Sequence, residues 1–278
     1  MTAAKTVVVT GGTSGIGRAA SVQLARAGSR VIIVGRDAEK AARVAAEIRA
    51  EAGAGEVVAL AADLSSPAAV RALATSIAQA CDHLDALVLN AATSAWGTSR
   101  RATPDGFELL LATNYLAPFL LARLLIDIRP PSRIVVIGAR LVGARWNFDD
   151  PQLEQGWTPI RATTQAKLGL YAMTRVLAAR LADRGIAVNI LDPGLVMTPY
   201  QERADATLRA MIEKVGRSAE RVAETYTWLA IDPSADAITG RAFRDREEEF
   251  AITGDAADDT LATSIFKDTE RMLRLLPL

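Results

Sequence analysis

The segment Thr10-Gly11-Gly12-Thr13-Ser14-Gly15-Ile16-Gly17 joins an apolar run at residues 6–10 to a stretch with helical spacing of apolar residues. Its glycines follow the pattern G-x-x-x-G-x-G, which permits a tight turn and a close approach of backbone to a pyrophosphate. The helix that follows offers unbonded N–H groups and its positive dipole end to the anion. The segment therefore predicts a dinucleotide site at Gly11, Thr13, Ser14, Gly15, Ile16 and Gly17, with an ordinary glycine turn as the alternative.

Short β-branched runs alternate with longer helical patterns along the rest of the chain. The expected strands are residues 6–10, 30–34, 56–61, 86–89, 133–137, 187–191 and 237–244. The expected helices are residues 16–27, 39–52, 67–80, 106–128, 164–184 and 256–275. This alternation predicts an α/β fold, a single Rossmann-type doubly wound parallel sheet with helices on both faces, over residues 1–278. Residues 195–235 and 256–278 are expected to lie outside the sheet as a substrate lid and a C-terminal cap.

Composition excludes several classes of function. The chain has 278 residues, 50% of them hydrophobic, with 32 basic and 32 acidic side chains. A balanced charge argues against a nucleic-acid partner. With Cys81 and His83 as the single residues of their types, neither an internal disulfide nor a Cys/His zinc site is expected. We expect no metal, and a Ser-His or Cys-His hydrolytic site would have to use His83.

We expect no secretory signal at the start of the chain, because residues 1–6 lead directly into Val7-Val8-Val9. The most apolar window, residues 109–128, contains Asn114, Pro118, Arg123 and Asp127, which a membrane span tolerates poorly. We therefore expect a buried helix in a cytoplasmic protein that has no membrane partner.

The end of the second expected strand indicates which dinucleotide binds. An acidic residue there would accept bonds from a ribose 2′-hydroxyl and repel a 2′-phosphate. This chain has Gly35 and Arg36 instead, and a guanidinium matches a phosphate. Asp37 is expected to cap the following helix, and Ser14 to add a hydroxyl to the same phosphate. The sequence therefore favours NADP(H) over NAD(H).

The chain resembles the short-chain dehydrogenase/reductase family over essentially its whole length, in particular the retinol-dehydrogenase-like and WW-domain-oxidoreductase-like branch. The resemblance implies an adenine contact at Asp63-Leu64 and a cofactor contact at Asn90-Ala91, where Ala92 replaces the family's glycine. The matching segment Pro193-Gly194-Leu195-Val196-Met197-Thr198 would hold the nicotinamide carboxamide, with cofactor contacts from Pro193, Gly194, Val196 and Thr198.

The same resemblance implies a catalytic tetrad of Asn, Ser, Tyr and Lys. Asn114 and Lys167 match the family's asparagine and lysine, and Lys167 would also bind the cofactor ribose. However, Ala139 stands at the serine position and Thr163 at the tyrosine position, 24 residues apart as in this branch. Threonine is short, its hydroxyl is a weak acid, and alanine cannot hydrogen-bond. Ordinary tetrad-driven carbonyl reduction is therefore not expected.

Other side chains near these positions are expected to pack or to face solvent. They are Tyr171, on the same helix face as Thr163, then Arg140, Arg145, Trp146, Asp149 and Asp150 in the segment after the fifth strand, and Tyr200.

Three functions remain open at this stage. The first is an NADP(H)-dependent oxidoreductase with a non-standard site acting on a small organic substrate such as a secondary metabolite. The second is a non-redox cyclase, dehydratase or isomerase, and the third is a catalytically silent partner or regulatory subunit, because fold does not fix function. We expect a homodimer or homotetramer built on the long apolar helices at 106–128 and 164–184, or a hetero-oligomer with an active paralogue.

Overall fold

The sheet has eight strands in the order β3-β2-β1-β4-β5-β6-β7-β8. The computed structural model describes residues 4–94, 97–198 and 206–278. The strands are β1 (Thr6–Thr10), β2 (Arg30–Gly35), β3 (Val57–Ala61), β4 (Leu84–Leu89), β5 (Pro131–Ile137), β6 (Ala187–Leu191), β7 (Ala242–Phe243) and β8 (Glu249–Phe250). All neighbouring strands are parallel except β7 and β8, which are antiparallel. The prediction of a doubly wound, mainly parallel sheet is confirmed.

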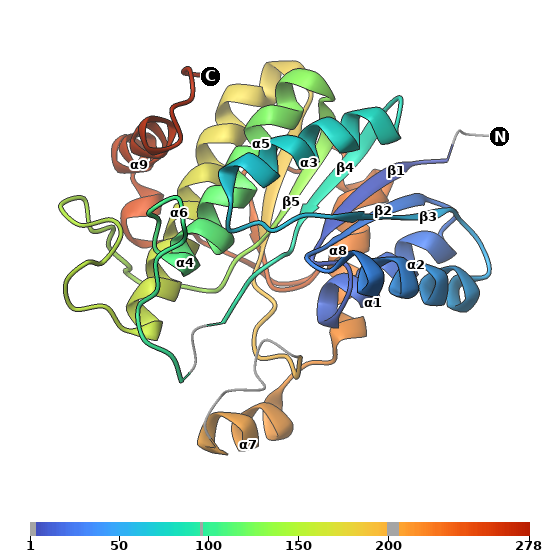
Figure 1. Cartoon of the computed structure of the whole chain (residues 1–278), viewed down its shortest axis with the longest axis horizontal. Helices are drawn as coiled ribbons and strands as arrows, with labels where there is room; N and C mark the ends of the chain where they lie inside the picture. The colour runs from blue at the N-terminus through green and yellow to red at the C-terminus, as the bar shows by residue number, and fades with distance from the viewer. Residues whose placement is uncertain (1–3, 95–96, 199–205) are drawn as a thin grey trace.

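Helices cover both faces of this sheet (Figure 1). One layer holds α1 (Gly15–Arg26), α2 (Ala38–Ala52) and α8 (Ala219–Ile231). The other holds α3 (Pro67–Ala80), α5 (Ala117–Ile128) and α6 (Pro159–Leu181), with α9 (Asp259–Met272) packed on α6. Because the strands are buried on both faces, β1 is apolar without alternation, as its Val7-Val8-Val9 run shows.

Local signals explain where several helices begin. Asp37 caps α2, since its carboxylate accepts a hydrogen bond from the Lys40 backbone N–H at 2.8 Å. Helix α3 begins at Pro67 after Ser66, as expected, although the Ser66 hydroxyl makes no capping bond. Helix α6 begins five residues before its expected start, because Thr158 caps it and Pro159 occupies its first turn.

The expected helix at residues 106–128 is interrupted. A short α-helical turn, α4 (Leu109–Leu111), leads into a π-helical turn, η1 (Ala112–Leu116), before α5 begins. Pro118 explains the interruption, because it has no N–H to donate to the carbonyl of Asn114 four residues earlier. The continuous helix expected from the apolar pattern was therefore wrong at the residues nearest to Asn114.

The expected strand at residues 237–244 shortens to β7. Before β7, the Asn189 side chain of β6 bonds the backbone, donating to the Ile238 carbonyl and accepting from the Arg241 N–H. Within residues 195–235, α8 packs on α1 and on strands β4 and β5, so it belongs to the layer that covers the sheet. Helix α7 (Ala206–Val215) lies apart from both layers (Figure 1). A lid role for the part before α8 stays a prediction.

Helix α9 covers the apolar face for which we expected a dimer contact. The Phe266 ring meets the Phe119 ring with centroids 4.7 Å apart, and the Tyr115 hydroxyl hydrogen-bonds to that of Thr269 at 2.7 Å. A buried ion pair joins Arg123 to Glu270 at 3.5 Å. The chain itself occupies this part of α5 and α6, and the expected homodimer or homotetramer stays a prediction.

Within the part of the chain that the structure describes, one stretch, Leu109–Ile128, is long and apolar enough to cross a membrane, with a mean hydropathy of 1.8. Its most apolar window is 83% buried inside the fold, as in a core helix.

Candidate functional site

The turn from β1 into α1 has the shape that a pyrophosphate needs. Gly11 has a φ of 67°, and a Cβ at this position would lie 2.9 Å from Ala91 Cα. A Cβ at Gly17 would collide with the Gly11 carbonyl and the Asn90 side chain. Only glycine lets these backbone segments pack so closely, and the Ser14 hydroxyl makes no capping bond to the first turn of α1. The turn therefore presents backbone N–H groups and an uncommitted hydroxyl to an anion.

The ends of β1 and β4 are held together beside this turn. The Thr10 hydroxyl accepts hydrogen bonds from the backbone N–H groups of Asn90 and Ala91 at 3.0 and 3.1 Å. The Asn90 amide donates to the Thr10 carbonyl at 3.0 Å and accepts from the Tyr226 hydroxyl at 3.2 Å. Asn90 and Ala91 thus lie beside the glycine turn, where the sequence predicted a cofactor contact. Thr10 and Tyr226, which position them, were not predicted.

The adenine end of the predicted cofactor site follows β2 and β3. Arg36 is exposed directly after β2, and Gly35 packs so closely on Thr13 that a Cβ would lie 2.6 Å from its methyl group. Asp63 is exposed after β3, and its carboxylate accepts bonds from the Ser65 N–H and hydroxyl at 3.0 and 2.8 Å. This places Arg36 and Asp63 at the carboxyl ends of adjacent strands, where dinucleotides bind in this type of fold.

The segment after β6 contains the predicted carboxamide contacts. Pro193 and Gly194 are half-buried, Val196 is buried and bridges to Arg217, and Thr198 is half-buried. Tyr200, the next side chain that we considered, lies outside the described residues.

Asn114 lies on the π-helical turn and is buried. Its amide oxygen accepts from the Thr93 N–H at 2.7 Å, and its amide nitrogen donates to the Thr93 carbonyl at 2.9 Å. Both ends of the side chain are committed, so Asn114 fixes the segment after β4 to the helix. A π-helical turn is a frequent feature of functional sites.

Lys167 is the buried cation of the site. Its Nζ donates to the carbonyl of Ile137, the last residue of β5, at 2.8 Å. Burial lowers the pKa of Lys167 to about 8, although the nearby Asp192 carboxylate acts in the opposite direction. An unfolded lysine has a pKa near 10.4, so the folded state disfavours the charged form of this side chain.

A pH-dependent stability follows from this depressed pKa. Between about pH 8 and 10.4 the folded chain has lost the Lys167 proton while the unfolded chain retains it, so stability rises with pH, by about 3 kcal/mol. We therefore expect the free energy of unfolding of the wild type to rise with pH relative to that of Lys167→Met, as measured by urea denaturation across that range. If the difference in unfolding free energy between the two proteins does not change with pH, the lowered pKa of Lys167 is contradicted.

The expected serine and tyrosine positions lie close to Lys167 along the chain but carry small side chains. Ala139 follows β5 two residues after Ile137, and Thr163 lies one turn before Lys167 on α6. Both are half-buried. Neither offers a phenolic acid.

Asp192 and Arg244 are site residues that sequence reasoning missed. Asp192 is 5% exposed at the end of β6, and its carboxylate accepts from the Gly194 N–H at 2.9 Å. The Arg244 guanidinium lies 3.9 Å from the same carboxylate and directly against Gly194. The only signal in the sequence is the place of Asp192, immediately before Pro193-Gly194.

Tyr171 is buried one turn beyond Lys167. A Cβ at Gly138 would lie 3.0 Å from its hydroxyl, which has no hydrogen-bond partner among the described residues. Burial raises the pKa of this phenol above its ordinary value.

The polar and aromatic residues after β5 differ in exposure. Trp146 is buried against Tyr115, whereas Arg140, Arg145 and Asp149 are exposed and Asp150 is half-buried. His83 is exposed directly before β4, at the amino ends of the strands, whereas the site lies at their carboxyl ends, as expected.

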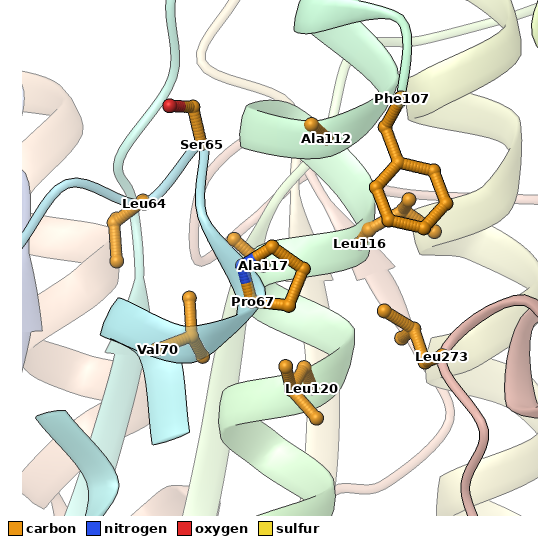
Figure 2. Close-up of a pocket in the computed structure, with 10 residues that line it drawn as sticks. All are labelled: Leu64, Ser65, Pro67, Val70, Phe107, Ala112, Leu116, Ala117, Leu120 and Leu273. Atoms are coloured by element: carbon orange, nitrogen blue, oxygen red, sulfur yellow. The ribbon is translucent and has the colours of Figure 1, made fainter. Parts of the chain in front are cut away.

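Figure 2 shows a cavity between α3 and α5 that is closed by Leu273. Its volume is about 10 Å³, barely enough for one water molecule, and its lining is apolar except for Ser65. It contains neither Lys167 nor Asp192, so it is a packing gap and not a substrate site.

Across the described ranges 4–94, 97–198 and 206–278, no three His, Cys, Asp or Glu side chains gather as metal ligands would.

The described geometry defines a Rossmann-type dinucleotide-binding protein with a buried lysine at the carboxyl end of its sheet. A family model described as Enoyl-(Acyl carrier protein) reductase matches residues 11–244. Human retinol dehydrogenase 14 is 33% identical over 295 residues, covering 98% of this chain and 87% of that protein. A putative daunorubicin C-13 ketoreductase from a Streptomyces species is 34% identical over 269 residues, covering 95% of this chain and 90% of that protein.

Solved structures agree with these relatives. A short chain dehydrogenase from Burkholderia cenocepacia in complex with NADP superposes with a TM-score of 0.70 at 28% identity, covering 87% of this chain and 96% of that one. The chain belongs to the short-chain dehydrogenase/reductase family, whose members here are oxidoreductases that use a nicotinamide cofactor.

Proposed function

We propose that this protein is an NADP(H)-dependent oxidoreductase with a non-standard active site that acts on a small organic substrate in the cytoplasm. The observation that carries the proposal is the contrast between the two ends of one site. The phosphate turn is shaped so that only glycine fits at positions 11 and 17, whereas Ala139 and Thr163 provide no phenol or serine at the catalytic end.

The nicotinamide cofactor, when bound, supplies or accepts a hydride. The chain's own residues then have distinct tasks. The glycine turn and Ser14 bind the pyrophosphate, Arg36 binds the 2′-phosphate, and Gly194 and Thr198 hold the carboxamide. Lys167 provides a buried positive charge where the ribose and the substrate oxygen meet.

The segments that follow β5 and β6 favour an apolar substrate. Val142 and Phe148 after β5, Met197 after β6, and Met211 and Val215 on α7 are all exposed. They belong to the carboxyl-end segments that surround a substrate in this type of fold. We propose a carbonyl compound with a large apolar skeleton, and the Streptomyces relative, named as a putative ketoreductase, supports a ketone as its reacting group.

Replacing Arg36 by alanine is expected to weaken NADPH binding about 10–100-fold and to leave NADH binding unchanged. The guanidinium would otherwise make charge-assisted hydrogen bonds with the 2′-phosphate, worth about 1.5–3 kcal/mol. Titration calorimetry with both cofactors measures the change. Lys40→Ala is the matched control, because it removes an exposed cation from the first turn of α2, after the residue that caps it. Equal loss of NADPH and NADH affinity would contradict the assignment of Arg36.

The proposed function is tested with NADPH that carries deuterium at the hydride position, mixed with a panel of apolar ketones. Transfer of deuterium to a product supports an oxidoreductase. Product formed without oxidation of NADPH would identify a non-redox enzyme instead. Binding of NADPH with no product from any ketone, together with co-purification of an active paralogue, would identify a silent partner.

A further inference from the structure

The carboxyl ends of β5 and β6 enclose a small group of buried polar side chains. Lys167 donates one of its three N–H groups to the Ile137 carbonyl, and the described residues supply no other hydrogen-bond acceptor for Nζ. Asp192, 5% exposed, exerts a favourable electrostatic effect on this ammonium group. The remaining Lys167 donors therefore have no acceptor among the described residues and are available to a ligand.

Few of the neighbouring groups can exchange a proton near neutral pH. The Tyr171 phenol is harder to ionise than an ordinary tyrosine, because burial and Asp192 both raise its pKa. Thr163 has an aliphatic hydroxyl, and Ala139 has no polar group. Lys167 is left as the group whose proton is both present and exchangeable.

We propose that Lys167 exchanges the proton with the substrate oxygen directly, and that Asp192 is the positioning residue that keeps its ammonium charged. This inference rests on the proposed function. In the direction of reduction, the carbonyl carbon accepts a hydride from the reduced cofactor and the π electron pair of the C=O bond moves onto oxygen. An N–H bond of the Lys167 ammonium then breaks as the O–H bond of the alcohol forms. The neutral amine regains a proton from solvent.

The environment of Lys167 suits this exchange. Burial lowers its pKa to about 8, so the ammonium form persists at neutral pH but gives up its proton more readily than a surface lysine. Asp192 after β6 is the charged group that acts on Lys167, and Asp192 and Arg140 both act on Tyr171, which lies one turn further along α6. Since reduction consumes the protonated form, its rate should be highest below about pH 8 and fall above it.

The first test observes Lys167 itself, in protein without cofactor. The chain has five lysines, Lys5, Lys40, Lys167, Lys214 and Lys267, so NMR of labelled lysine side chains gives few signals. The signal lost in Lys167→Met is expected to titrate near pH 8. Asp192→Asn should move that midpoint to lower pH, because the carboxylate opposes the effect of burial. Asp245→Asn, which removes a carboxylate paired with Arg217, should leave it unchanged.

The second test follows single-turnover oxidation of NADPH at saturating cofactor, with phenanthrenequinone as an apolar carbonyl probe. Lys167→Met and Lys167→Arg are both expected to reduce the rate about 10²–10⁴-fold, because arginine keeps the charge but does not release a proton. Asp192→Asn should shift the fall in rate to lower pH. No turnover by the wild type would overturn the proposed function and this inference with it. Wild-type rate in Lys167→Arg, or a Lys167 midpoint near 10.4, would overturn this inference alone.

Discussion

The double variant Ala139→Ser, Thr163→Tyr is expected to reduce apolar ketones about 10²–10⁴-fold faster than the wild type, the range that a positioned acid contributes. A tyrosine at position 163 lies one helical turn before Lys167, so its phenol and the lysine share one face of α6. The buried ammonium then stabilises the phenolate and lowers the pKa of the new tyrosine. The serine hydroxyl adds a hydrogen bond to the substrate oxygen.

Controls separate this effect from a general change in packing. Thr164→Tyr introduces the same ring at the neighbouring half-buried position, about 100° around the helix from position 163, so its phenol should not reach the substrate oxygen and should give no gain. Ala139→Ser alone should give only a small gain, because it supplies no acid. NADPH consumption with phenanthrenequinone measures all four proteins. A folded double variant that binds NADPH and is no faster would show that Ala139 and Thr163 do not occupy the serine and tyrosine positions.

Local signals in the sequence account for most of the fold. Residues 6–10, 67–80 and 187–191 have the observed bounds, because β-branched runs and a proline at the first helical turn act over a few residues. The unpredicted features depend on distant contacts. The backbone before the shortened β7 bonds the side chain of Asn189, and β8 pairs antiparallel with β7, which its own two residues do not indicate.

The two ends of the candidate site also differ in how far the local sequence predicts them. The phosphate turn is continuous in sequence, so its shape follows from glycine spacing. The environment of Lys167 is built from the ends of β5 and β6 and from α6, which meet only in the folded chain. An aspartate before Pro193 carries no sequence signal of its own, and its importance appears only when Lys167 is buried beside it.

Phe266→Ala in α9 is expected to lower the free energy of unfolding by about 3–5 kcal/mol, the usual cost of truncating a buried phenylalanine. The ring is fully buried, packs against Phe119 at 4.7 Å, and carries the Arg180 guanidinium on its face at 4.8 Å. Its loss leaves a cavity where α9 meets α5 and α6. Urea denaturation measures the change, and Lys267→Ala, at the exposed neighbouring position, should change stability by less than about 0.5 kcal/mol.

The same variant tests whether α9 prevents self-association. When α9 detaches more often, the apolar face of α5 and α6 becomes exposed, and contiguous apolar surfaces of this kind promote association. We therefore expect Phe266→Ala to form more dimer with rising concentration than Lys267→Ala does, as measured by sedimentation velocity. Arg123→Met should act in the same direction, because it leaves Glu270 as an unpaired buried charge. If Phe266→Ala loses stability and its oligomeric state is unchanged, α9 stabilises the fold without controlling association, and any oligomer is built on another surface.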